Sequence, residues 1–82
     1  VSREGREDGW ALLAEVASSA DAYDPYYRLA AAHALVEAGV ASAWLSHEVG
    51  ETLVTEMSAP HWPDDLRAKA RAVAKATARS EH

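Results

Sequence analysis

Apolar positions recur along most of the chain at the three- and four-residue spacing of an amphipathic helix. The pattern is densest between Asp24 and Val40, where Asp24 suits an N-cap and Pro25 suits the first helical position. Gly39 predicts the end of this helix, since glycine readily adopts the left-handed conformation that follows many helices. Because a helix apolar on several sides packs on more than one of them, we expect it at the centre of the molecule or of its assembly.

Three further helices are predicted around this central one. They span residues 8–20, 41–57 and 64–79, and a loop containing Pro60, Trp62 and Pro63 precedes the last of them. The polar residues 1–7 are expected to form a frayed lead-in. No stretch shows the alternation of a strand. The sequence therefore predicts an all-α fold, a single small domain over residues 1–82 built from about four helices.

The residues expected at the helix starts are Asp8, Ser42 and either Asp64 or Asp65, whose side chains can accept hydrogen bonds from free backbone N–H groups. Gly50 lies inside the predicted third helix, where glycine costs about 1 kcal/mol relative to alanine. It marks either a weak point or the close approach of another backbone.

The size and composition of the chain point towards a partner. A chain of 82 residues buries only about 60 to 65 per cent of its unfolded surface, and its many alanines add little volume to a core. The absence of cysteine excludes disulfides, thiolate metal sites and cysteine nucleophiles. No apolar stretch is long enough to span a bilayer and the N-terminal residues are not signal-like, so we expect a cytoplasmic protein that does not bind a membrane.

Charge is distributed unevenly along the chain. The net charge is −5, with a balance of −7 over residues 1–63 (three Arg, ten Asp or Glu) and of +2 over residues 64–82 (five Lys or Arg, three acids). The acidic balance argues against general binding of nucleic acid. The last helix nevertheless carries a basic stripe at i+4 spacing: Arg67, Arg71, Lys75 and Arg79. We interpret this stripe as a solvated face or as a surface that docks onto an acidic neighbouring subunit.

Candidate chemistry is sparse. His33 with Glu37 and His47 with Glu51 stand at i,i+4 spacing, but a metal site needs three or four converging ligands. We interpret both pairs as hydrogen bonds on helix surfaces and assign no metal ligands and no catalytic residues to this chain. Six aromatic residues favour an interface, although some of them belong in a core: Trp10, Trp44, Trp62, Tyr23, Tyr26 and Tyr27. The residues alone thus indicate a helical interaction module.

The segment Pro25-Tyr26-Tyr27-Arg28, followed by Leu-Val-Glu-Ala-Gly-Val from Leu35, resembles the helical N-terminal half of the nitrile hydratase beta subunit. Similar stretches occur in the accessory proteins of that system and in thiocyanate hydrolase. The resemblance implies a small beta-like subunit of an enzyme, a lyase, that hydrates a nitrile to an amide. It further implies cobalt or iron on a cysteine-rich alpha subunit, no cofactor on this chain, and two partners: the alpha subunit and a C-terminal beta-like chain.

Carried over by position, the resemblance places Tyr26 in the substrate pocket and Ala30 where the family has a second pocket aromatic, which widens the cavity. The family's arginine in the preceding helix falls on Trp10, and the nearest arginine is Arg6. The residues expected to contact partners are Tyr27, Arg28, Trp44, Trp62, Arg67, Arg71, Lys75 and Arg79. Two alternatives remain open, namely an accessory protein that helps metal loading and an unrelated helical binding module such as an antitoxin.

Overall fold

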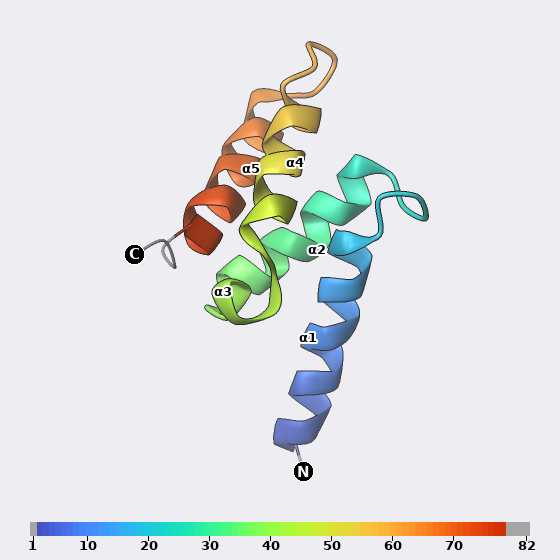
Figure 1. Cartoon of the computed structure of the whole chain (residues 1–82), viewed down its shortest axis with the longest axis vertical. Helices are drawn as coiled ribbons and strands as arrows, with labels where there is room; N and C mark the ends of the chain where they lie inside the picture. The colour runs from blue at the N-terminus through green and yellow to red at the C-terminus, as the bar shows by residue number, and fades with distance from the viewer. Residues whose placement is uncertain (1, 79–82) are drawn as a thin grey trace.

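The computed structural model describes the backbone of residues 2–78 and the side chains of residues 8–78. Every regular element in this part of the chain is a helix, which confirms the predicted all-α class (Figure 1). The helices are α1 (Ser2–Ser18), α2 (Pro25–Glu37), α3 (Ala41–Trp44), α4 (His47–Met57) and α5 (Asp64–Thr77). None of these helices is both long and apolar enough to cross a lipid bilayer.

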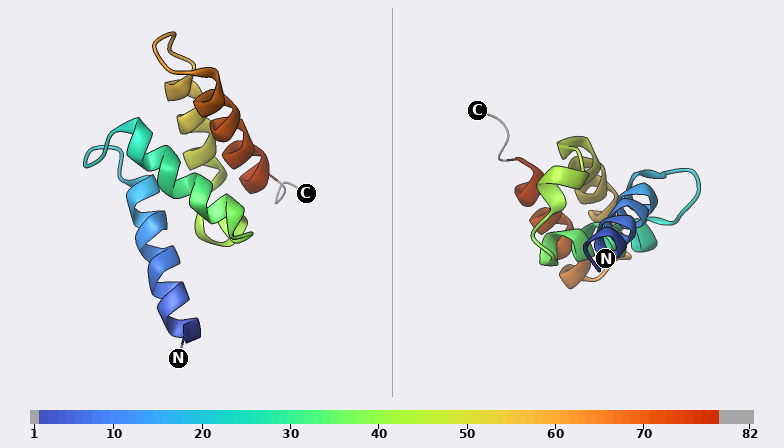
Figure 2. Two further views of the ribbon diagram at one scale, coloured as in Figure 1. Left: turned by 180° about the vertical axis from the view of Figure 1, so that it is seen from behind. Right: turned by 90° about the horizontal axis from the view of Figure 1, so that it is seen from below.

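The helices form two hairpins that meet at α2. Helix α1 packs along α2, α4 packs along α5, and α2 also packs on α5. Seen from behind, α2 runs between α1 and the α4–α5 pair (Figure 2). The N-terminal half of α1 extends away from the body of the molecule (Figure 1). The expected central position of the helix that follows Asp24 is therefore confirmed.

The core is built mainly where α2, α4 and α5 meet. Its largest fully buried side chains are Leu29, Leu35, Leu53, Met57 and Val73. On α2 the small residues Ala31 and Ala32 are buried as well, so that this helix is covered on two sides. Trp10, Leu13 and Val16 of α1 are partly buried against the same cluster. One contiguous core thus links the two hairpins.

Helix α2 starts and stops close to where the sequence predicts. Asp24 has the extended backbone of an N-cap, although its side chain makes no capping hydrogen bond. At the other end Gly39 adopts a positive φ of 78°, and its N–H donates to the carbonyl of Val36. The N–H of Val40 donates to the carbonyl of Leu35. This pair of hydrogen bonds is the Schellman arrangement, which satisfies carbonyls at the helix end.

Helix α1 is longer than the sequence predicts. Its backbone is helical from Ser2, so the expected start at Asp8 is wrong, and the helix ends at Ser18. The residues before Asp8 include Arg and Glu, which have straight side chains with good helix propensity. The stretch contains no proline, and its one poor helix former, Gly5, does not end the helix. Counting only apolar periodicity therefore placed the start too late.

The predicted helix over residues 41–57 is interrupted. Leu45 (φ −122°, ψ 145°) and Ser46 (φ −84°, ψ 158°) are extended, and they separate the single turn α3 from α4. The break buries Leu45, and it makes Ser46 rather than Ser42 the N-cap of the main helix. Burying the Leu45 side chain stabilises the fold more than an uninterrupted helix would, because few residues of this stretch pack against the core.

Gly50 lies where α4 packs tightly against α5. A Cβ atom placed on Gly50 would lie 2.7 Å from the Cα atom of Ala74 and 3.1 Å from Oγ1 of Thr77. The second interpretation of this glycine, the close approach of another backbone, is therefore confirmed. Helix α5 begins at Asp64 with Pro63 at its N-cap, so Asp64 and Asp65 lie in the first turn and do not cap it.

Candidate functional site

Two exposed tyrosines stand at the start of α2. Tyr26 is 50% exposed and Tyr27 is 58% exposed, and their rings meet edge to face with centroids 5.7 Å apart. The fixed φ of Pro25 starts the helix directly before them, which leaves both rings on its first turn. Exposed rings of this kind bury a large area at low entropic cost when a partner covers them.

Beside these rings a surface pocket of about 180 Å³ lies between α2 and α5. Tyr26 and Ala30, which are one turn apart, line it together. The remaining lining residues are Leu29, His33, Ala34, Glu37, Leu66 and Lys69. Trp10 does not line this pocket, because it lies on α1 and is partly buried against the core.

The pocket combines an apolar floor with a polar rim. Leu29 and Leu66 supply the floor, while the Tyr26 hydroxyl and the Lys69 ammonium group can hydrogen-bond a ligand. His33 Nδ1 lies 3.8 Å from Glu37 Oε2 across one helical turn. The volume corresponds to about six water molecules and is below the range of about 300–1,000 Å³ typical of ligand pockets. On its own the pocket therefore holds only a small group or one end of a larger molecule.

Arg28 lies inside the molecule, which corrects its prediction as a partner-binding residue. It is 4% exposed, and its Nε donates to the carbonyl of Tyr23 at 3.0 Å. Its Nη2 donates to Oε2 of Glu56 at 3.1 Å, and Nη1 lies 2.9 Å from Oε1 as an ion pair. The guanidinium group thus joins α2 to α4. Sequence spacing could not reveal this pairing, because Glu56 follows 28 residues later.

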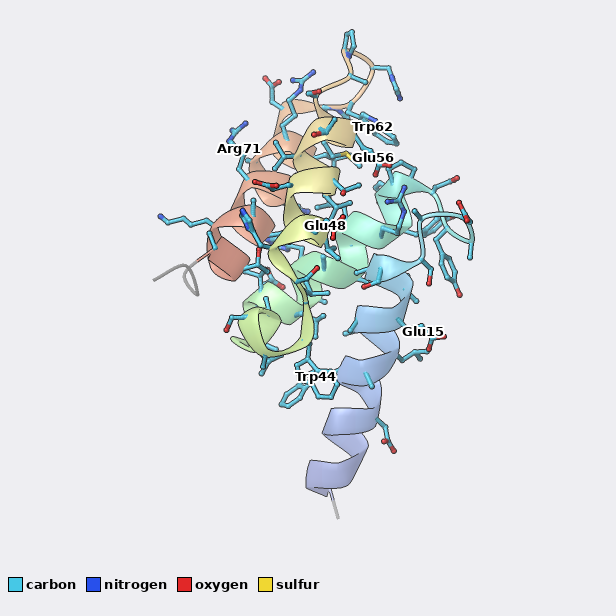
Figure 3. The ribbon with its side chains drawn as sticks, viewed as in Figure 1. Glu15, Trp44, Glu48, Glu56, Trp62 and Arg71 are labelled. Carbon is cyan, nitrogen blue, oxygen red and sulfur yellow. The ribbon has the colours of Figure 1, made fainter. Side chains whose placement is uncertain are left out.

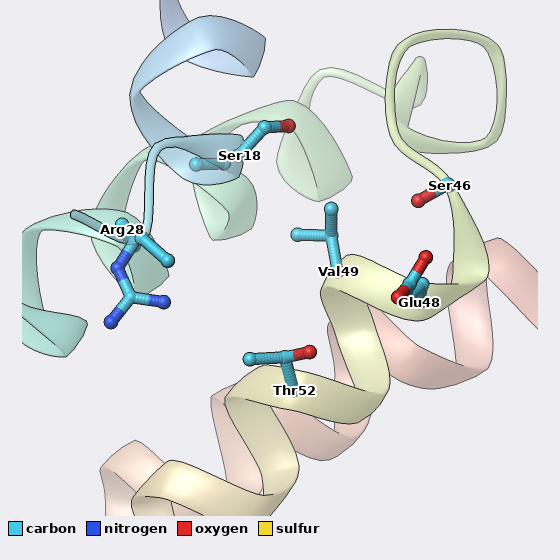
Figure 4. A pocket seen from close by; sticks show the side chains of 8 residues that line it. Ser18, Arg28, Ser46, Glu48, Val49 and Thr52 are labelled. Carbon is cyan, nitrogen blue, oxygen red and sulfur yellow. The ribbon is translucent and has the colours of Figure 1, made fainter. Parts of the chain in front are cut away.

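A second hollow, of about 350 Å³, opens where the end of α1 faces the start of α4 (Figure 4). Arg28 lies on one side of it, with Ser18, Val49 and Thr52 around the opening (Figure 4). Glu48 adds a carboxylate at the rim. Since Glu56 already neutralises Arg28, this hollow offers no free positive charge to an anionic ligand. No sequence motif indicates this hollow, because its residues come from three separate segments: 17–20, 28 and 46–52.

The predicted basic stripe is divided by the structure. Arg67 turns back towards the preceding loop, where its Nε donates to the carbonyl of Met57 and its Nη2 to that of Ala59, both at 3.2 Å. Its Nη1 pairs with Asp64. Arg67 is therefore an anchor of the loop and not a free cation. Arg71 and Lys75 remain exposed on α5, whereas Arg79 and the side chain of Arg6 lie outside the described residues.

The two other tryptophans predicted at an interface differ in exposure. Trp44, on α3, is 36% exposed and lies beside α1 (Figure 3). Trp62 is half-buried against the core, and its ring centroid lies 4.7 Å from that of His61 in the same loop. Trp62 therefore holds the loop against the core, while Trp44 keeps a surface that a partner can reach.

His47 contacts one side chain on its own helix and one on α5. His47 Nε2 lies 3.0 Å from Glu51 Oε2, and His47 Nδ1 lies 3.3 Å from Oγ1 of Thr77 on α5. Among the residues whose side chains are described, no group of three or more His, Cys, Asp or Glu side chains converges to hold a metal ion. The contact of His47 with Glu51 thus joins two turns of α4, and its contact with Thr77 joins α4 to α5.

Comparisons of the chain with protein-family models, with curated proteins and with solved structures found no match. The resemblance stated above therefore rests on the sequence from Pro25 to Val40 alone.

Proposed function

We propose that this chain is a small helical subunit that docks against a metal-bearing subunit of a nitrile hydratase and lines its substrate pocket. The observation that carries the proposal is that Tyr26 and Ala30 line one surface pocket, at the positions that the resemblance assigns to the substrate pocket. The pocket is too small to enclose a substrate alone, so a partner surface completes it. The exposed ring of Tyr27 stands next to it, within reach of the same partner.

In this proposal the reaction takes place on cobalt or iron held by the cysteines of the alpha subunit, in the cytoplasm. This chain contains no cysteine and contributes binding surface. The phenol of Tyr26 donates a hydrogen bond towards the substrate, and Ala30 leaves space for a bulky nitrile. Trp10 lies on α1, where it packs against the core and does not line the pocket, so the substrate contacts come from α2.

The test begins with co-expression of this chain and a neighbouring-gene product that carries a Cys-x-x-Cys-Ser-Cys motif, together with any C-terminal beta-like chain. The proposal expects a complex of fixed stoichiometry that contains the metal and converts benzonitrile to benzamide. Binding that is lost once the metal has been loaded would identify an accessory protein instead. If no such gene product binds, or if a toxin is the neighbouring partner, the proposal is wrong.

Two substitutions then test the pocket within the complex. Tyr26→Phe removes one hydroxyl and is expected to change KM or kcat for benzonitrile about tenfold, as for one lost hydrogen bond of about 1.5 kcal/mol. Ala30→Trp fills the pocket and is expected to raise KM more for benzonitrile than for acetonitrile. The matched control is Tyr23→Phe, because Tyr23 is exposed but does not line the pocket. Equal kinetics for Tyr26→Phe and the unchanged complex would refute the assignment of the pocket.

A further inference from the structure

A shallow groove of about 540 Å³ runs along the outer face of the α4–α5 hairpin. Val54 and Ala74 form its apolar floor, with Glu51 on the α4 side and Arg71 on the α5 side. Arg71 projects outward from α5 in Figure 3. Helix α5 lines this groove together with α4 and lines the Tyr26 pocket together with α2, so the two sites lie on different faces of α5.

The charges beside this groove are separated by helix. Of the acids of α4 only Glu51 lines the groove, and of the cations of α5 only Arg71 lines it. Glu51 and Arg71 line the same groove without forming an ion pair with each other, since the ion pair of Glu51 is with His47. The groove is therefore bordered by a carboxylate on one helix and by a guanidinium group on its antiparallel neighbour.

We propose that the α4–α5 groove is the contact surface of a homodimer, in which α4 of each copy lies against α5 of the other about a two-fold axis. A two-fold contact uses the same patch twice, so that residue i meets residue j and j meets i. Glu51 of one copy then meets Arg71 of the second, and this pair occurs twice. Val54 and Ala74, which are half-buried in the single chain, are covered on both copies.

Charge complementarity selects a second copy as the occupant. The positive charge that complements Glu51 of α4 is Arg71 of α5, and both belong to the same chain. When two hairpins face each other about a two-fold axis, α4 of one copy lies over α5 of the other, so that these two residues meet. A standard interface buries about 800 Å² per partner, roughly one-seventh of the 5246 Å² exposed by the chain. The apolar floor is small, so the dimer is weak and salt-sensitive, with a dissociation constant below about 1 mM. This inference goes beyond the proposed function and leaves the Tyr26 pocket accessible.

Charge reversal tests the proposal with the full chain alone. Sedimentation velocity at low salt, from about 10 μM to 1 mM protein, is expected to show a monomer that converts to a dimer. Glu51→Arg and Arg71→Glu each convert two attractive pairs into two repulsive pairs, and each is expected to raise the dissociation constant at least about tenfold. The double variant restores both pairs in reversed polarity and is expected to return within about threefold of the unchanged chain.

Three controls keep the result specific. Glu37→Arg reverses an exposed charge at the Tyr26 pocket and is expected to leave dimerisation unchanged. Glu51→Gln removes the contact with His47 without adding a positive charge, which separates a loss of helix stability from repulsion across the interface. Circular dichroism confirms that each variant is folded. A chain that stays monomeric at 1 mM, a single reversal without effect, or a double variant that fails to restore the dimer each overturns the proposal.

Discussion

Replacing Gly50 with alanine tests the close approach of α4 to α5. The new Cβ atom would lie 2.7 Å from Cα and 3.0 Å from the backbone nitrogen of Ala74. Both neighbouring atoms belong to the backbone, so no side chain can rotate away. To reach an ordinary contact of 3.4 Å, α4 and α5 must separate by about 0.7 Å.

The expected loss of stability follows from two opposing terms. Forcing an extra methyl group into a packed interior costs about 1–3 kcal/mol, and the upper value applies because the obstacle is backbone. Alanine offsets about 1 kcal/mol of this through its better helix propensity. The net loss is therefore about 2 kcal/mol. For a domain of this size it corresponds to a melting temperature lower by about 8–16 °C.

Thermal unfolding followed by circular dichroism measures this effect, and urea unfolding at 25 °C gives the free energy directly. Gly9→Ala is the matched control, because Gly9 lies in α1 with nothing within 4 Å of the added Cβ atom. That variant is expected to be more stable by about 0.5–1 kcal/mol. If Gly50→Ala matched or exceeded the stability of the unchanged chain, the described spacing of α4 and α5 would be wrong.

Three further substitutions test the turn, the buried ion pair and the loop anchor by urea unfolding. Gly39→Ala places a side chain at positive φ and is expected to cost about 1–2 kcal/mol, so an unchanged midpoint would contradict the described turn. Glu56→Gln leaves the buried Arg28 without its counterion and is expected to cost about 1–3 kcal/mol, while adding Arg28→Met should recover part of the loss. Arg67→Ala releases two loop carbonyls, with an expected cost of about 1 kcal/mol and faster proteolysis of the loop, neither of which should follow from Arg71→Ala.

The sequence predicted the class of the fold because helix periodicity and helix ends are local properties. Pro25 and Gly39 bound α2 as expected, since each acts through its own backbone geometry. The break at Leu45 was missed for the opposite reason. It depends on burying one leucine among residues that are distant in sequence, and the local pattern was consistent with an uninterrupted helix.

The candidate site was predictable only where its residues share one helix. The resemblance assigned Tyr26 and Ala30 to one pocket, and the two residues lie one turn apart on α2 and line the same pocket. The partners of Arg28 and Arg67 could not be predicted from their spacing in the sequence. Arg28 is neutralised by a carboxylate on another helix, and Arg67 is held by carbonyl groups of a loop whose path depends on the folded chain.

The two hairpins also determine how fast the chain can fold. Each pairs helices that are neighbours in sequence, α1 with α2 and α4 with α5, so most of the chain gains packing after closing only a short loop. Helical proteins with such local contacts fold in microseconds to milliseconds. The Arg28–Glu56 ion pair, which joins one hairpin to the other, requires both to be in place. It is therefore expected to form after the transition state, where its loss accelerates unfolding and leaves the folding rate unchanged.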